Sequence, residues 1–176
     1  MSRAILDDRD AWSQAFESGW LAHFRETGER DWSQYPRPRN RPLDPTPGVD
    51  LQDARLILIS SAGGYDPATQ APFDAANDLG DYSIREIPFF DADPAALAFA
   101  HDRYDGAARD EDVGVLLPNR LLQERLETGL IGGLTSTWVS FMGYQPDMRG
   151  VIDETCARVV EVALREHAQA ALLVPS

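Results

Sequence analysis

A segment near the middle of the chain, His101-Asp-Arg-Tyr-Asp105, carries side chains that could transfer a proton. On helical spacing His101 and Asp105 share a face, so the carboxylate could orient the imidazole and raise its basicity, as general acid–base catalysis requires. Tyr104 completes this candidate catalytic set. One alternative is structural, with the histidine stabilised by a helix C-terminus and the aspartates solvated. Another is a hard metal ion, because three more carboxylates follow at 110–112, although their spacing matches no known ligand set.

A second candidate site is the loop at residues 60–66, which reads Ser-Ser-Ala-Gly-Gly-Tyr-Asp. Paired glycines permit positive φ angles and let backbone N–H groups approach an anion closely. The hydroxyls of two serines lie alongside, so the loop predicts a carboxylate or oxyanion site formed by Ser60, Ser61, Gly63 and Gly64. The alternative is a tight turn that needs glycine. A dinucleotide fingerprint is excluded, since it should open a helix and the prolines at 67 and 72 would break a helix at this place.

The only cysteine, Cys156, lies on a helical apolar stripe, which also includes Ile152, Val159, Val160, Ala163 and His167. A buried thiol at such a position usually behaves as a small hydrophobe with a raised pKa. We therefore expect Cys156 to be a core residue, with a nucleophilic role as the alternative. A single cysteine also excludes an internal disulfide, a CxxC redox pair and a multi-cysteine zinc site within one chain.

Composition excludes further classes of chemistry. The 176 residues suffice for one domain of ordinary size, and all 16 basic residues are arginine. Without lysine, Schiff-base enzymes, pyridoxal-phosphate enzymes and Walker-type P-loops are excluded. The net charge of −13 disfavours nucleic acid and anionic membranes as partners. No signal peptide and no apolar run of about 20 residues is visible, so we expect a cytoplasmic protein.

The pattern predicts three regions along the chain. Residues 1–34 contain an amphipathic helix at about 9–26, on which aromatic residues recur every four positions: Trp12, Phe16, Trp20 and Phe24. Residues 35–50 hold five prolines and three arginines and form a linker or extended arm. Residues 51–176 form the domain proper. The helix could pack on its own domain or on a neighbouring subunit.

Within the domain, strands are expected at residues 55–60, 82–87, 113–117, 138–142 and 171–174, and helices at 94–103, 119–128 and 151–167. Asn119 should cap the second helix. Strands alternating with helices predict an α/β fold, a Rossmann-like three-layer sandwich around a mainly parallel sheet. Ligands gather beyond the carboxyl ends of such strands, which draws attention to the loops after Ile59, Ile87, Leu117 and Met142.

Six segments, taken in order, resemble the selenoprotein B family of glycine, sarcosine, betaine and D-proline reductases. They read Ser61-Ala-Gly-Gly-Tyr, Gly80-Asp-Tyr-Ser-Ile-Arg-Glu-Ile-Pro88, His101-Asp-Arg-Tyr-Asp105, Pro118-Asn-Arg-Leu121, Gly129-Leu-Ile-Gly132 and Ser140-Phe-Met-Gly143. Each motif alone is weak, but the ordered set, which runs from about residue 50 to the C-terminus, is fairly specific.

The resemblance implies reductive cleavage of a carbon–heteroatom bond in a small amino-acid-like substrate, with a selenolate or thiolate as nucleophile and a dithiol as reductant. On this chain the paired-glycine loop would bind the substrate carboxylate, and Arg85 is an alternative anion clamp. Met142 and Gly143, at a strand end, are further candidate substrate-binding residues. His101 with Asp105 would transfer the proton.

The chain departs from the family after Ser176, where the family continues into a segment that begins with selenocysteine or cysteine. We expect one of three explanations: a UGA codon read as a stop, a redox segment supplied by a separate chain, or a fold that has lost thiol chemistry. In the first two cases we expect no cofactor bound by this chain; an external dithiol, or the selenocysteine- or cysteine-containing segment, would supply the redox chemistry. We expect the chain to form a homo-oligomer or to bind a redox partner chain. The competing functions are a non-catalytic binding or assembly subunit that uses the aromatic helix as an interface, and a non-redox lyase or isomerase that uses His101 and Asp105.

Overall fold

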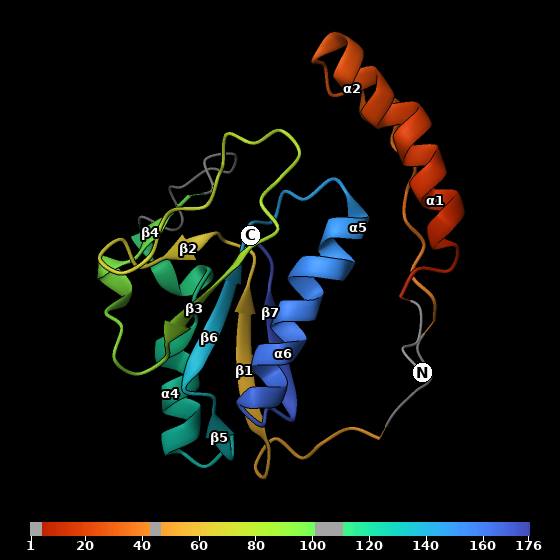
Figure 1. Cartoon of the computed structure of the whole chain (residues 1–176). Helices are drawn as coiled ribbons and strands as arrows, with labels where there is room; N and C mark the ends of the chain where they lie inside the picture. The colour runs from red at the N-terminus through yellow and green to blue at the C-terminus, as the bar shows by residue number, and fades with distance from the viewer. Residues whose placement is uncertain (1–4, 43–46, 101–110) are drawn as a thin grey trace.

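The computed structural model describes residues 5–42, 47–100 and 111–176, and shows an α/β fold built on a mixed sheet (Figure 1). The central strand is β1 (Arg55–Ser60), the apolar run of the sequence, and all its residues except Arg55 are buried. It pairs in parallel with β6 (Thr137–Phe141) on one side and with β7 (Ala170–Val174) on the other. Strand β3 (Ile84–Pro88) lies antiparallel to β6.

Two strands pair with the same side of β1. The short β5 (Gly133–Leu134) pairs with the beginning of β1, and β6 pairs with the end of β1. Arg55 pairs with Gly133 but Ile59 pairs with Val139, so the chain contains two extra residues between these pairings. Thr135 fills this interruption with a buried side chain, whose hydroxyl donates to the Thr137 carbonyl at 2.6 Å. The interruption sets the register that brings Ser140 beside Ser60.

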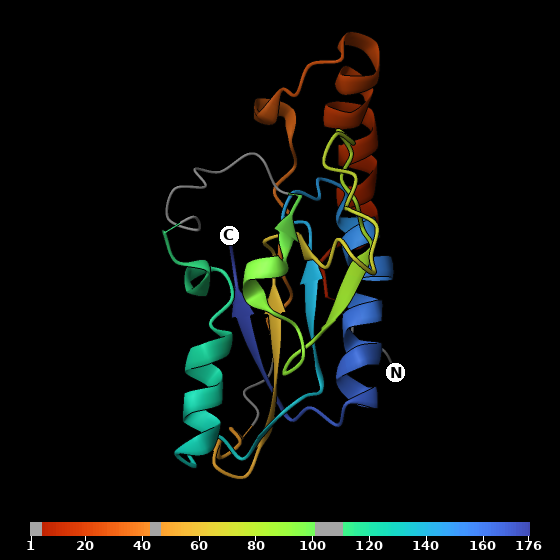
Figure 2. The same cartoon turned by 90° about the vertical axis from the view of Figure 1, so that its left-hand side faces the viewer.

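Helices cover both faces of the sheet (Figures 1 and 2). Helix α4 (Asn119–Glu127) packs through Leu122 on the face that holds Leu56, Leu58 and Trp138. A continuous helix packs through Val162 on the opposite face; its parts are α5 (Met148–Gly150), η5 (Val151–Cys156) and α6 (Ala157–Arg165). The arrangement is compatible with the predicted sandwich, and most of its strand pairs are parallel.

Two predicted elements are wrong. The expected strand at 113–117 begins instead as a 3₁₀ turn, η4 (Val113–Val115), because the Asp112 carboxylate accepts from the Gly114 N–H at 2.8 Å and stabilises a turn. The described part of the expected helix at 94–103, residues 94–100, contains instead a 3₁₀ turn, η3 (Pro94–Ala96), followed by β4 (Ala98–Phe99); residues 101–103 lie outside the described residues. Strand β4 pairs with β2 (Gly64–Tyr65), and this tertiary pairing outweighs the helical propensity of the alanines.

The N-terminal helix packs on the chain's own domain. It runs through α1 (Arg9–Phe16), η1 (Glu17–Leu21) and α2 (Ala22–Thr27), and the short η2 (Trp32–Gln34) follows. Its aromatic rings stack in sequence, with 5.0 Å between the centroids of Trp12 and Phe16 and 5.6 Å between those of Phe16 and Trp20. Met148 and Ile152 of the helix on the sheet pack against this cluster. Trp12, Phe16 and Trp20 of the aromatic stripe are therefore buried within the chain, and Phe24 is partly buried.

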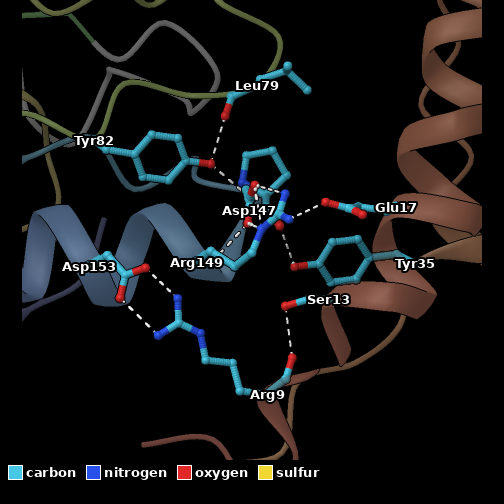
Figure 3. Close-up of polar contacts among 10 residues, drawn as sticks. Arg9, Ser13, Glu17, Tyr35, Leu79, Tyr82, Asp147, Arg149 and Asp153 are labelled. Carbon is cyan, nitrogen blue, oxygen red and sulfur yellow. Dashed lines mark hydrogen bonds and ion pairs between the residues drawn. The ribbon is translucent and has the colours of Figure 1, made fainter. Parts of the chain in front are cut away.

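Polar contacts at the rim hold this helix in place (Figure 3). The Arg9 guanidinium donates to the Asp153 carboxylate at 2.9 Å, and Tyr35 donates to the Pro146 carbonyl at 2.8 Å. Arg149 bonds to both Asp147 and Glu17, which joins α5 to η1. Burial raises the pKa of the Asp147 carboxyl, but the hydrogen bonds from Arg149 outweigh it and hold that pKa below its usual value.

Among residues 5–42, 47–100 and 111–176, no helix has the length and apolar character needed to cross a membrane.

Candidate functional site

A polar row crosses the sheet at the carboxyl end of β1. Ser60 pairs with Ser140 in the parallel ladder, and Ser140 pairs with Arg85 in the antiparallel one. Paired residues of neighbouring strands project to the same face, here the face covered by α4. The preceding row on that face is apolar and consists of Leu58, Trp138 and Ile87. The sheet thus ends in a polar layer above an apolar one.

The two buried serines in this row differ in their partners. The Ser60 hydroxyl donates to the Leu116 carbonyl at 3.1 Å and accepts from the Ala62 N–H at 3.3 Å. The Ser140 hydroxyl is also fully buried, but it has no hydrogen-bond partner in the described part of the chain. A buried polar group without a partner is costly and marks a place where a water or a ligand group is expected.

The predicted paired-glycine loop follows β1 and lies against the ends of three strands. Its N–H groups already have acceptors: Ser61 donates to the Val174 carbonyl at 3.1 Å, and Gly63 to the Phe141 carbonyl at 3.0 Å. Gly63 has a φ of +67°, in the left-handed region that favours glycine. These bonds make the loop a rigid turn, and they occupy the N–H groups of residues 61 to 63 that the predicted anion site would need.

The C-terminal residue lies beside the same loop. The Ser176 N–H donates to the Ser61 hydroxyl at 3.0 Å, and the two hydroxyl oxygens are 3.2 Å apart. This contact follows from the parallel pairing of β7 with β1, which ends with Ser60 opposite Val174. The chain therefore reaches its last residue at the carboxyl end of the sheet, next to the loop of Ser61.

Met142 and Gly143, the candidate substrate-binding residues at a strand end, also lie against this loop. Met142 is buried and forms an isolated antiparallel bridge with Ala62. A Cβ atom at Gly143 would lie 3.3 Å from the Ser61 carbonyl oxygen, closer than most Cβ contacts. The structure thus brings together Ser60, Ser61, Gly63, Met142 and Gly143. Gly64 continues into β2.

Arg85, the predicted alternative anion clamp, holds a neighbouring segment in place. Its guanidinium donates to the carbonyls of Ala71 at 3.0 Å and Pro72 at 3.1 Å, and lies over the Phe73 ring at 4.2 Å from its centroid. It also donates to the Ser83 hydroxyl at 2.8 Å. These contacts use most of its donors within the protein, so Arg85 is an anchor for residues 71–73 in this conformation.

The catalytic candidates His101, Tyr104 and Asp105 lie outside the described residues. The loop expected to form a site after Ile87 lies at the opposite end of the sheet, because β3 is antiparallel and the Phe89 N–H donates to the Ser136 carbonyl just before β6. The loops after Ile59 and Met142 meet at the carboxyl end of β1, whereas Leu117 leads through Pro118 into α4.

A cavity of about 590 Å³ opens at the N-terminus of α4. Its apolar lining includes Val113, Leu117 and Leu121, and its polar lining includes Asn119 and Arg120. Asn119 is the first helical residue and not the predicted cap, since Pro118 occupies the N-cap position and no side chain caps the helix. The Asn119 amide is buried and its Oδ1 has no hydrogen-bond partner in the described part of the chain.

Cys156 is expected to be an unreactive thiol. It lies half-buried in η5, and burial raises the pKa of its thiol. A raised pKa lowers the thiolate fraction at pH 8, so iodoacetamide should alkylate Cys156 several times more slowly than it alkylates free cysteine, and the rate should keep rising above pH 9. Mass spectrometry of the alkylated protein measures both rates. A rate equal to that of free cysteine, or a plateau below pH 8, would show an activated thiol.

Sequence reasoning missed Ser140 as a member of the polar row and Asn119 as a buried residue of the cavity lining at α4. Each belongs to one of the six motifs, but their importance depends on burial and on strand register. One signal was present for Ser140, because a serine lies near the carboxyl end of each of two apolar strand segments, at 60 and at 140. Comparisons with protein-family models, with curated proteins and with solved structures find no match to this chain.

Proposed function

We propose that this chain is an oxidoreductase of the glycine and D-proline reductase type, or the substrate-binding part of one, and that it acts on a small carboxylate-bearing amino compound. The substrate would lie at the carboxyl end of β1 and β6, near Ser61 and Gly143. His101 and Asp105 would protonate the leaving amine. The proposal starts from the resemblance of the ordered motifs, two of which, at 61–65 and 140–143, meet at the carboxyl end of β1.

The single observation that carries the proposal is the position of Ser176 beside Ser61. The family's nucleophile follows the strand that corresponds to β7. In this structure, a residue attached after Ser176 would start next to the paired-glycine loop, so a selenolate or thiolate there, or one from a second chain, would be close to a substrate held at that end of the sheet.

In the proposed reaction the thiolate or selenolate attacks the substrate carbon that bears the amine, and a carbon–sulfur or carbon–selenium bond replaces the carbon–nitrogen bond. The departing amine takes a proton. One thiol of an external dithiol then attacks the sulfur or selenium, the carbon–sulfur or carbon–selenium bond breaks, and the carbon takes a proton to give the reduced product. The second thiol displaces the thiolate or selenolate, so the nucleophile is regenerated and the dithiol is oxidised to a disulfide. Cys156 is not suited to the first step, because its thiol lies in the helix on the opposite face of the sheet from α4 and its pKa is raised.

Intact-mass spectrometry of the protein isolated from its natural host tests the source of the nucleophile. The 176 residues account for 19.5 kDa. The proposal predicts either a larger mass that includes a selenium- or cysteine-containing segment after Ser176, or a co-purifying chain rich in cysteine. A mass equal to that of the 176 residues, with no such chain and no dithiol-dependent loss of substrate, would exclude the reductase.

A further inference from the structure

The cavity at the N-terminus of α4 contains groups that the proposed reductase chemistry does not use. In the described part of the chain, the N–H groups of Arg120 and Leu121 donate to no acceptor, whereas the Leu122 N–H donates to the Pro118 carbonyl. Free N–H groups in a helical first turn, together with the helix dipole, favour an anionic oxygen. Arg120 adds a guanidinium whose side chain is 93% exposed and which, among the described residues, makes only a 3.8 Å ion pair with Glu124.

A second, independent observation is the Asn119 amide. It is 3% exposed, lines the same cavity, and leaves its Oδ1 acceptor unpartnered within the described residues. An acceptor calls for a ligand group that donates, such as an ammonium or a hydroxyl, and not for the carboxylate itself. Asp112 also lines the cavity; one of its carboxylate oxygens accepts from the Gly114 N–H, and its negative charge favours a cation nearby.

The remaining walls are apolar. Five of the lining residues are Pro94, Val113, Leu117, Pro118 and Leu121. The volume of about 590 Å³ falls in the range of small-molecule sites and exceeds what a compound as small as glycine would fill. The cavity therefore combines backbone N–H groups that can bind an anion, an amide oxygen that can accept a hydrogen bond, and an apolar surface.

We propose that this cavity binds an aliphatic carboxylic acid with an ammonium or hydroxyl group on its α carbon. The carboxylate is received by the N–H groups of Arg120 and Leu121 and by the Arg120 guanidinium. The α substituent donates to Asn119 Oδ1, and the aliphatic chain contacts Val113, Leu117 and Leu121. This site does not depend on the reductase activity, because no nucleophile is needed for binding.

Binding of four related compounds to the full chain, measured by titration calorimetry, tests the assignment. They are leucine, 2-hydroxy-4-methylpentanoate, 4-methylpentanoate, which lacks the α substituent, and isopentylamine, which lacks the carboxylate. At least one of the first two should bind about tenfold more tightly than either of the last two, since each of these lacks one polar contact. Whichever of leucine and the hydroxy acid binds more tightly identifies the α substituent. Equal affinity for all four, or no binding by any, would overturn the proposal.

A matched pair of variants on the same helix locates the contact. Asn119→Leu should lower the affinity for the preferred ligand about tenfold, to that of 4-methylpentanoate, while Gln123→Leu, outside the cavity lining, should leave it unchanged. Equal effects of the two changes would contradict the role of Asn119. If Asn119→Leu does not fold, the amide signals of Arg120 and Leu121 in the unaltered protein decide the matter: they should shift with leucine or the hydroxy acid and not with isopentylamine.

Discussion

Replacing Trp138 by alanine is expected to destabilise the protein by about 3–5 kcal/mol, the usual cost of removing a large buried aromatic side chain. Trp138 is fully buried and belongs to the apolar layer directly below the polar row. Its ring also lies close to the end of the paired-glycine loop, because a Cβ added at Gly64 would be 3.4 Å from it. The loss should therefore appear both as a lower free energy of unfolding and as faster hydrogen exchange at residues 61–65.

Two comparison variants separate this effect from a general one. Trp138→Phe should cost much less, about 1–2 kcal/mol, because it keeps most of the ring volume and removes an indole N–H that has no partner among the described residues. Phe90→Ala, at a side chain that is 53% exposed, should cost under about 1 kcal/mol. Urea unfolding measures all three. A cost for Trp138→Ala no larger than that for Phe90→Ala would contradict the described core.

Ser60→Ala and Ser140→Ala should differ in their effect on the free energy of unfolding, although the two serines are adjacent in the sheet and both are fully buried. Ser60→Ala leaves the Leu116 carbonyl and the Ala62 N–H without their bonds to the hydroxyl and should cost about 2–3 kcal/mol. Ser140→Ala removes a hydroxyl that has no partner in the described part of the chain, so it should be neutral or slightly stabilising.

The same two substitutions also test whether a ligand or a water bonds to the Ser140 hydroxyl. If a ligand or a bound water satisfies Ser140 in solution, Ser140→Ala should weaken ligand binding while stability without ligand stays unchanged. Thermal unfolding with and without ligand gives both quantities. Equal destabilisation by the two substitutions would mean that the Ser140 hydroxyl has a protein partner, and the polar row would then be a structural feature only.

The sequence predicts the central strands and the helices that contain an apolar period. The run at 55–60, the stripe at 151–167 and the aromatic spacing at 9–26 each indicate one element, and each forms it. The choice between the chain's own domain and a second subunit for the aromatic helix cannot be made from the sequence, because it depends on Met148 and Ile152 lying opposite that helix in the fold.

Short segments without a clear period are harder to predict. Val113 to Leu117 contains apolar residues suited to a strand, but the Asp112 carboxylate stabilises a turn there. The direction of β3 relative to β6 depends on pairing across a long loop, and it moves the loop after Ile87 to the opposite end of the sheet. Local propensity carries no information about either outcome.

For the candidate site residues too, the sequence predicts some features and not others. The sequence correctly predicts a loop with two glycines at the end of β1, but the acceptors of its N–H groups come from β6 and β7. Arg85 is a reasonable anion clamp by residue type, because guanidinium suits carboxylates; the structure uses it to hold the carbonyls of Ala71 and Pro72. In both cases the residue type is informative about chemistry, and the fold decides which partner the group meets.

The most direct test of the proposed function is an NMR titration of the isotope-labelled full chain with glycine, sarcosine, betaine and D-proline in turn. At least one of these compounds is expected to shift the amide signals of Ser61, Gly63, Gly143 and Ser176 in a saturable manner. If none of the four compounds shifts these signals, or if the shifts are confined to Arg120 and Leu121 at the α4 cavity, the substrate site is not at the carboxyl end of β1 and β6.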